Sequence, residues 1–175
     1  LTLIKKEFIM FKSTAIALTL LSLSLTASAD WQVGGGFSNL SDDLGDGDDV
    51  SLSILYGSVS YKTDSSYDDF SFVPELRIGT GIGDDSLYGI KLEVKSFIAL
   101  SVRGQYEFSN GAYVYAMPSY ANLNIKASGS ESEDNWEFGV GAGVGYSLNK
   151  KLSVEASYEN YDDTNFLSVG FKYAF

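Results

Sequence analysis

The sequence predicts an all-β protein, specifically an eight-stranded antiparallel up-and-down transmembrane β-barrel preceded by a signal peptide. Three observations carry this prediction. Apolar residues recur at every second position along eight segments, which is the periodicity of a β-strand. The connections alternate between short turns and longer acidic loops. Aromatic residues gather at both ends of the segments, as they do at the two interfaces of a membrane.

The composition excludes several kinds of function. The 175 residues carry a formal net charge of −11 and include no Cys and no His. Without Cys there is no disulfide framework, thiolate metal site or Cys nucleophile, and without His the commonest general base and metal ligand are missing. An acidic chain without a basic stretch also binds nucleic acid poorly. We therefore expect no catalytic residue, no cofactor, no metal site and no nucleic-acid partner.

The first 29 residues have the organisation of a signal peptide. Met10-Phe11-Lys12 gives a charged start, Ala15–Leu25 is apolar, and Ala27-Ser28-Ala29 forms a cleavage site. The apolar run is too short to span a bilayer, which takes about 20 residues. We therefore expect a true start at Met10 and a barrel domain at residues 30–175. Cleavage removes three lysines and one glutamate, which takes the net charge from −11 to −13.

Four segments alternate most clearly between an apolar and a polar face: 88–108, 136–148, 152–159 and 166–175. Segment 88–108 keeps one parity throughout and is longer than a membrane requires, so we expect its start to project beyond the bilayer. Three others, at 31–38, 70–82 and 112–126, alternate less cleanly. In 112–126 the expected apolar face holds Tyr113, Tyr115, Met117, Ala121, Leu123 and Ile125.

The remaining segment, 50–61, changes parity. Val50, Leu52 and Ile54 are in phase with one another, whereas Leu55, Val59 and Tyr61 are out of that phase. A β-bulge near Ile54–Tyr56 explains the change, and so does a wrong segment boundary.

Alternation fits either a soluble barrel with an apolar interior or a membrane barrel with an apolar exterior. The polar faces favour the membrane barrel, because runs such as Gly139–Gly145 would leave a solvated surface with little that is polar. The connections agree: 109–111 and 149–151 are short, and the alternate ones at 39–49, 83–87, 127–135 and 160–165 are acidic. Only the connection at 62–69 is longer than a periplasmic turn should be.

Aromatic residues mark the two ends of the segments. Those expected in the belt beside the short turns are Trp31, Tyr61, Phe70, Phe72, Tyr106, Phe108, Tyr113, Tyr115, Tyr146, Tyr173 and Phe175. Those expected in the opposite belt are Phe37, Trp136, Tyr158 and Phe166. Ordinary β-propensity of aromatic residues does not predict clustering at both ends.

Two stretches resemble a known group. The ending from Phe166 to Phe175 resembles the C-terminal strand by which outer-membrane proteins are recognised for assembly, and Gly139–Tyr158 resembles the penultimate hairpin of the small porin-family barrels. That group contains outer-membrane proteins A and X and the opacity proteins. The resemblance implies a place in the bacterial outer membrane, contact with its lipid and lipopolysaccharide, and recognition by the barrel-assembly machinery through Phe171, Tyr173 and Phe175.

Charged residues on the polar faces are the candidate interior site. A narrow lumen favours mutual pairing, so we expect a network of Glu75, Arg77, Arg103, Glu107, Glu155 and Lys172. Glu155 and Glu159 lie four residues apart on one face, where acid–base chemistry is the alternative to charge pairing. Known enzymes among small outer-membrane barrels rest on a catalytic His, which this chain lacks, so we expect no enzymatic activity.

Two further motifs are weaker. The acidic run Asp42–Asp49 suggests calcium, but its spacing fails the EF-hand register, which favours a solvated loop. The run Gly139–Gly145 lies within a strand and lacks the Lys and following helix of a phosphate loop.

The expected function is that of a monomeric, non-enzymatic barrel with acidic surface loops, serving adhesion, envelope integrity or another surface interaction, and exposed as a surface antigen. The main alternative is a narrow passive pore for ions or small solutes, because eight strands leave an interior only just filled by side chains. A soluble periplasmic ligand-binding barrel is the third possibility and requires the two faces to be reversed.

Overall fold

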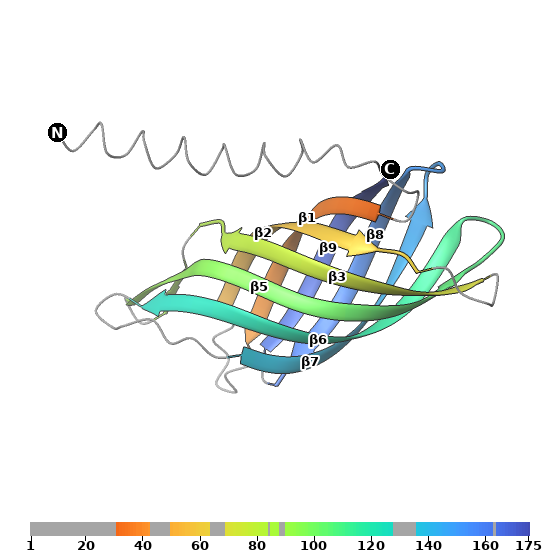
Figure 1. The fold of residues 1–175 in the computed structure, drawn as a ribbon. Coiled ribbons are helices and arrows are strands. Elements are labelled where there is room, and N and C mark those ends of the chain that lie inside the picture. The colour runs from red at the N-terminus through yellow and green to blue at the C-terminus, as the bar shows by residue number, and fades with distance from the viewer. Residues whose placement is uncertain are drawn as a thin grey trace.

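Short segments rich in β-branched and aromatic residues, separated by Gly, Asp, Asn and Ser, form nine strands within the part of the chain that the structure describes (Figure 1). The computed structural model describes residues 31–42, 50–63, 69–83, 85–87, 90–127, 136–162 and 164–175. The strands are β1 (Trp31–Asp42), β2 (Val50–Tyr61), β3 (Phe70–Gly81), β4 (Asp85–Leu87), β5 (Ile90–Glu107), β6 (Ala112–Ala127), β7 (Trp136–Ser147), β8 (Leu152–Tyr161) and β9 (Thr164–Ala174). Among these residues no helix is long and apolar enough to cross a membrane. The predicted signal peptide, residues 1–29, lies outside the described residues.

Eight of the strands close into one antiparallel barrel. Each strand pairs with its neighbour in sequence, β3 pairs with β5, and β1 pairs with β9 from Gln32↔Ala174 to Asp42↔Thr164. The predicted eight-stranded up-and-down barrel is therefore confirmed. The short strand β4 pairs with the beginning of β5, on the same edge of β5 that pairs with β3 farther along, so it extends the β3–β5 hairpin. It lies within the segment 83–87, which the sequence suggested was a plain connection.

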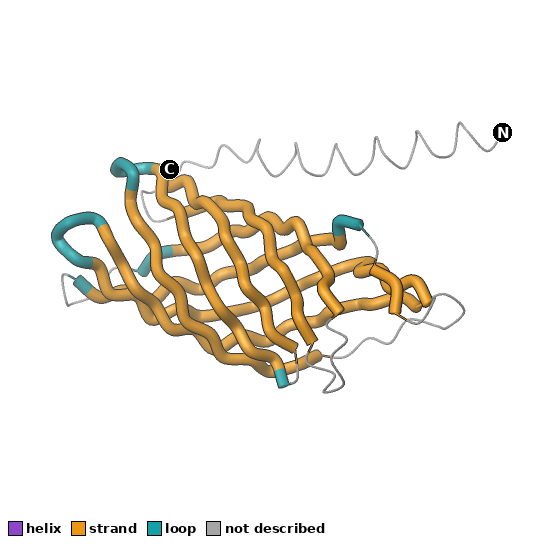
Figure 2. Tube along the Cα trace, turned by 180° about the vertical axis from the view of Figure 1, so that it is seen from behind, coloured by secondary structure: helices purple, strands orange, loops and turns teal. Residues whose placement is uncertain are grey.

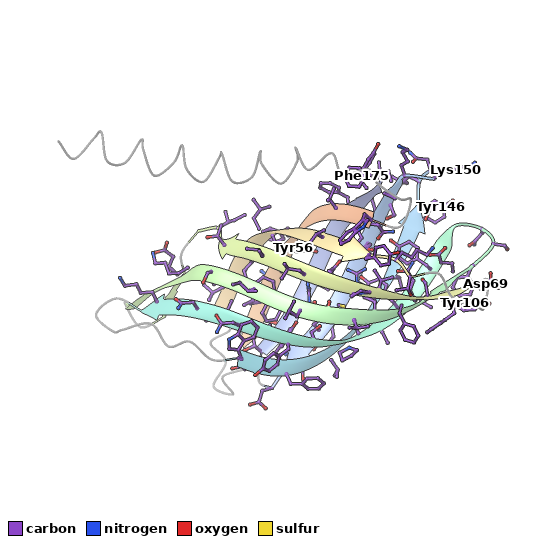
Figure 3. All side chains as sticks on the ribbon, viewed as in Figure 1. Tyr56, Asp69, Tyr106, Tyr146, Lys150 and Phe175 are labelled. Carbon is purple, nitrogen blue, oxygen red and sulfur yellow. The ribbon has the colours of Figure 1, made fainter. Side chains whose placement is uncertain are left out.

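The two ends of the barrel differ. The turns at 109–111 and 149–151 lie at the same end as Trp31 and Phe175, and we name this the turn end. Asp69, Tyr106, Tyr146, Lys150 and Phe175 gather there, at the right and upper right of Figure 3, and Figure 2 shows the same turns from behind. The opposite end, where β1, β6 and β8 finish, is the loop end.

Alternation along each strand places apolar side chains on the outer surface. Phe138 is 62% exposed and Leu167 is 60% exposed, whereas Ser168 and Glu159 are almost completely buried. The expected outward faces of 70–82, 136–148, 152–159 and 166–175 are found as predicted. The outer surface of the barrel is therefore an apolar band, and the small and charged residues at the alternate positions of these strands face the interior.

The predicted orientation of β6 was wrong. Tyr113, Tyr115, Met117 and Ala121 face the interior, and the alternate residues, including Tyr120, face outward. The reason lies in the neighbouring strand, because Tyr113 pairs with Gly145 and Tyr115 pairs with Gly143. Each large ring therefore faces a glycine across the ladder. Tyr113 and Tyr115, as well as Phe166, which is also buried, do not belong to the aromatic belts.

The β-bulge that was one explanation for the change of parity in 50–61 is not found. β2 pairs with β1 without interruption from Trp31↔Tyr61 to Asp42↔Val50, so it has no bulge. Its inward face changes from apolar residues near the loop end to serines near the turn end. In the sequence this change of composition looks like a change of parity. The register shift lies in β5, between Val94 and Ser96. Val94 consequently faces inward whereas Leu100 faces outward, so the expectation of one parity throughout 88–108 was also wrong.

Candidate functional site in the barrel lumen

Arg103 lies at the centre of the polar part of the lumen. Its Nη1 donates to both carboxylate oxygens of Glu155 at 2.9 Å, and its Nη2 donates to Glu75 Oε1 at 2.9 Å and Oε2 at 3.1 Å. Lys172 Nζ donates to Glu75 Oε2 and, at 3.1 Å, to Ser60 Oγ. These residues come from β2, β3, β5, β8 and β9, so the contacts join walls of the barrel that are far apart in sequence.

A second pair lies beside this group. Arg77 donates from Nη1 and Nη2 to the two oxygens of Glu159 at 2.5 and 2.6 Å, in the bidentate geometry that a planar guanidinium favours. Tyr161 and Ser119 also donate to Glu159 Oε2, at 2.7 and 3.1 Å. Arg77 Nε lies 3.5 Å from Glu75 Oε1, which links the pair to Arg103.

We name Glu75, Arg77, Arg103, Glu155, Glu159 and Lys172 the charge network. It contains three cations and three carboxylates, and every one of these side chains is at most 9% exposed or fully buried. Burying an ion is costly unless it is paired and hydrogen-bonded. Matching the charges one to one makes burial inside a narrow barrel possible.

The structure brings together five of the six residues that the sequence suggested. Glu107 is the exception, because it lies at the turn end with its side chain 39% exposed and accepts from Lys62 Nζ at 2.5 Å and Gln105 Nε2 at 2.7 Å. Glu159 was missed as a network member, although its parity with Glu155 was visible. Glu155 and Glu159 bind different arginines, which is the arrangement of charge pairing.

Tyrosine rings fill the space beside the charges. The Tyr113 hydroxyl donates to Glu155 Oε1 at 2.9 Å, and the Arg103 guanidinium lies 4.3 Å from the centroid of the Tyr115 ring. The glycines of β7 make room for these rings, because a Cβ on Gly145 would overlap Tyr113 and one on Gly143 would overlap Tyr115. The run Gly139–Gly145 is therefore the complement of the lumen side chains.

An apolar layer occupies the lumen nearer the loop end. Its buried members are Leu40, Leu52, Ile54, Val94, Phe97, Ala99, Ala121, Tyr161 and Phe166. The Phe97 and Phe166 ring centroids are 5.7 Å apart, and the Arg77 guanidinium lies 5.8 Å from the Phe97 ring, where the layer meets the charge network. The sequence did not suggest this layer, because apolar residues of both parities occur in the strands that supply it.

Within the described part of the chain, no three or more carboxylates are grouped as metal ligands. The acidic run Asp42–Asp49, for which calcium was considered, lies outside the residues whose side chains are described.

A closed barrel with an apolar exterior and a charged interior matches a known family. The model of the outer membrane protein beta-barrel domain matches residues 13–175. The chain belongs to this family. Members of the outer membrane protein beta-barrel family lie in the bacterial outer membrane, and so does this chain. Its apolar band is the lipid-facing surface, so the soluble periplasmic alternative is wrong.

Solved structures of this architecture confirm the fold. The attachment invasion locus protein Ail of Yersinia pestis has a TM-score of 0.60 and 13% identity, with 85% of this chain and 99% of Ail covered. Neisserial surface protein A has a TM-score of 0.55 and 16% identity, with 85% and 98% covered. The N-terminal barrel of Pseudomonas aeruginosa OprF has a TM-score of 0.52 and 17% identity, with 83% and 98% covered. A comparison with curated protein sequences gives no match.

Proposed function

We propose that the protein is a non-enzymatic, non-conducting barrel of the outer membrane that acts through its outward connections, in adhesion or another surface interaction that supports the envelope. The observation that carries this proposal is that two layers of side chains, one charged and one apolar, fill the lumen. A solute entering from the turn end meets the charge network, and behind it the apolar layer packs Phe97 against Phe166. In this proposal the turn end faces the periplasm and the loop end faces the exterior, as in other barrels of the outer membrane.

The sign of the charge on the outward connections indicates the kind of partner. The segments 39–49 and 127–135 contain eight acidic residues and no basic residue. Ail has been solved in complex with the heparin analogue sucrose octasulfate, which is a polyanion. Like charges repel across short distances, so we expect this chain to favour a partner with a basic surface instead.

A pore would require both the charge network and the apolar layer to move aside. Opening the polar part would break ion pairs that Arg103 makes with two carboxylates, and opening the apolar part would expose buried rings. The contacts among the described residues therefore favour a closed lumen.

Two measurements test the proposal. In planar bilayers we expect the wild-type barrel to give no stepwise conductance, and reproducible open steps would contradict a closed lumen. For the surface role, cells displaying the protein are added to beads coated with a lysine-rich peptide and to heparin beads. We expect capture by the former only, and capture by heparin would overturn the predicted partner chemistry.

The matched variants change charge without changing loop length. Replacing Glu131, Glu133 and Asp134 by their amides should reduce capture on the basic beads. Replacing Asp64, Asp68 and Asp69 by Asn makes the same change of charge in the connection at the turn end, and should leave capture unchanged.

A further inference from the structure

Both prolines of the chain lie in one row of the outer wall. Pro74 on β3 pairs with Val102 on β5, and Pro118 on β6 lies on the other side of Val102. The three strands lie side by side at the front of Figure 1, and both prolines are exposed. Proline cannot donate to a ladder, so within sheets it is usually confined to edge strands and bulges. β3 and β6 each have a paired neighbour on both sides, so two prolines in one row need a reason.

Pro118 removes a hydrogen-bond donor from the β5–β6 ladder. Phe108 N donates to Ala112 O at 2.8 Å, and in an antiparallel pair the hydrogen-bonded positions recur at every second residue. The same period reaches Val102 and Pro118, where the proline has no N–H to donate. The β5–β6 pairing is accordingly interrupted at this position. The carbonyl oxygen of Val102 therefore lacks its ladder donor.

Pro74 has the same effect on the β2–β3 ladder. Thr63 N donates to Phe72 O at 2.9 Å, and the next hydrogen-bonded position toward the loop end joins Tyr61 to Pro74. The regular β2–β3 pairing stops one residue short of this position. The carbonyl oxygen of Tyr61 therefore lacks its ladder donor as well.

The Val102 carbonyl lies at membrane depth. Val102 is six residues from Phe108, which lies beside the turn at 109–111. At about 3.3 Å per residue and a tilt of about 45°, it lies about 14 Å from the turn, near the middle of a hydrocarbon core about 30 Å thick. Lipid tails offer no hydrogen-bond donor. Unpaired backbone is therefore tolerated at this depth only where protein covers it or where it lines a water-filled cavity.

The outer wall is hollowed around the two prolines. A trough of about 590 Å³ crosses β2, β3, β5 and β6, and Pro74, Val102 and Pro118 line it. Its exposed side chains are apolar, except that Tyr120 carries a hydroxyl and Trp31 an indole N–H. An apolar surface of this kind does not hold water, so protein is the remaining cover.

We propose that a second copy of this chain covers the trough, in a dimer whose twofold axis runs along the membrane normal. The same patch of both copies meets in such an interface, so the patch has to complement itself. In the proposed contact, the Tyr120 hydroxyl of each copy donates to the Val102 carbonyl oxygen of the other. A lipid acyl chain has no donor and would leave that oxygen unsatisfied. The dimer replaces the monomer that was expected from the sequence.

The positions of the donor and the acceptor allow this contact. Tyr120 is two residues nearer the loop end than Pro118, which lies opposite Val102 in the ladder. Two residues are about 7 Å along a strand, which a tyrosine side chain and a hydrogen bond span together. A twofold axis along the membrane normal keeps each residue at the same depth in both copies. Trp136 stacks on the Tyr120 ring, with centroids 5.1 Å apart and an interplanar angle of 20°, and so holds the ring against the wall.

Association in phospholipid vesicles tests the dimer. The chain contains no Cys, so Ser109→Cys provides a single label in the exposed turn between β5 and β6. Energy transfer between donor-labelled and acceptor-labelled barrels is followed as added lipid dilutes the protein, and sedimentation in density-matched detergent gives the mass. We expect transfer that falls on dilution and the mass of a dimer. The mass of a monomer, with transfer no higher than that of randomly distributed barrels, would overturn the proposal.

Removing one hydroxyl tests the contact. Tyr120→Phe should weaken the dimer about tenfold, because the twofold symmetry removes two hydrogen bonds at once. Tyr146→Phe makes the same change at a tyrosine on β7 that is equally exposed, at 48%, and should leave association within about twofold of wild type. Equal association of the Tyr120→Phe and wild-type barrels would contradict the proposed interface.

Restoring the missing donor tests the cause. Pro118→Ala returns an N–H to the ladder, so the Val102 carbonyl finds its donor within the same chain. We expect this variant to resist urea better than wild type and to dimerise at least about tenfold more weakly, a combination that a damaged barrel does not produce. Val144→Ala removes similar bulk from another part of the outer surface and should leave association within about twofold.

Two outcomes with Pro118→Ala would overturn the proposal. One is a variant that dimerises as tightly as wild type. The other is a variant that gains stability while the wild-type barrel is itself a monomer, which would assign the trough to lipid. Heat-modifiable mobility on gels verifies that each variant is folded. Conductance by the wild-type barrel would contradict the proposed function and leave these association measurements unaffected.

Discussion

Arg77 and Glu159 illustrate how a charge is accommodated inside this barrel. Their side chains are 3% and 0% exposed, and two parallel hydrogen bonds join them. A buried ion pair adds little net stability by itself, because desolvation offsets the attraction. Removing only one member is different, because the other charge then stays buried without its partner.

Arg77→Leu should therefore lower the free energy of unfolding by about 3–5 kcal/mol. Urea titration of the barrel refolded in lipid vesicles measures this effect. The double variant Arg77→Leu/Glu159→Leu should recover a large part of the loss. Lys62→Leu breaks a partly exposed pair at the turn end and should change stability by less than about 1 kcal/mol. A similar loss for Lys62→Leu and Arg77→Leu would show that burial is not the cause.

Two glycines provide a comparison of packing. A Cβ on Gly143 would overlap the Tyr115 ring and lie 2.7 Å from the Ala156 carbonyl oxygen, whereas a Cβ on outward-facing Gly57 has its nearest atom at 3.9 Å. Gly143→Ala should lower the free energy of unfolding by about 1–3 kcal/mol through overpacking. Gly57→Ala should stay within about 1 kcal/mol of wild type. The same urea titration measures both, and equal effects would argue against a filled lumen.

Single residues were predictable where parity and chemistry agreed. Arg103 and Lys172 are cations on polar faces, and both lie inside. Tyr113 and Tyr115 were misplaced because a tyrosine suits either an interfacial belt or a polar lumen. What decides between these places is Gly143 and Gly145 across the ladder, and pairing between β6 and β7 is not visible in the sequence of one strand.

At the scale of elements, the bulge in β5 determines which residues reach the outer surface. Without the bulge, Lys95 would face the lumen and Val94 would face the lipid. With the bulge, Val94 is buried in the lumen and Lys95 is exposed on the outside. The sequence did not reveal the shift, because Val94 continues the apolar alternation of its neighbours. A bulge is specified by pairing with the partner strand.

Cysteine labelling tests the bulge directly, since the chain contains no Cys. In micelles, Lys95→Cys should react with a small maleimide at least about tenfold faster than Val94→Cys. The reason is that the Val94 side chain is only 2% exposed, so a cysteine at that position would be buried. Glu93→Cys, which is exposed on the same strand, serves as the positive control. Faster labelling at position 94 than at 95 would restore the unbroken alternation.

The C-terminal strand β9 carries the proposed assembly signal. Phe171 and Tyr173 on β9 are 54% and 39% exposed, and Phe175 directly after it is 39% exposed, so a partner protein could reach all three before the barrel closes. Phe175→Ala should slow assembly in cells while leaving refolding in detergent nearly unchanged. Pulse-chase measurement of the heat-modifiable form provides the rate, and Leu148→Ala at the turn end provides a control. An equal delay in detergent would assign the effect to stability.

At the scale of the whole molecule, the apolar band has to match the bilayer. Val140 is 57% exposed in the middle of β7, and Leu148 is 55% exposed just beyond its end. Val140→Arg should cost about 2–4 kcal/mol and Leu148→Arg only about 0–1 kcal/mol, because the cost of an arginine falls from the bilayer midplane to the interface. Unfolding free energies in vesicles test the difference, and equal costs would contradict this placement of the band.

The overall architecture was predictable because each outward face repeats one simple rule, apolar at every second position, for lipid contact. The interior was less predictable because it follows two rules. Charges pair near the turn end, and Phe97 packs with Phe166 near the loop end. Leu40 and Phe166 are therefore apolar residues that face inward. A rule based on hydropathy alone would place them outside, although it places the residues at the other ends of their strands correctly.

The strands of the barrel are unequal in length, and this affects recognition by antibodies. β5 and β6 have 18 and 16 residues, whereas β8 and β9 have 10 and 11, and the excess projects at the loop end (Figure 1). Six additional residues at about 3.3 Å each and a tilt of about 45° raise one side by about 14 Å. In the proposed orientation, with the loop end outside, this raised side would obstruct an immunoglobulin that approaches across β5 and β6. We therefore expect antibodies against epitopes beside β8 and β9 to approach from the side of those two strands.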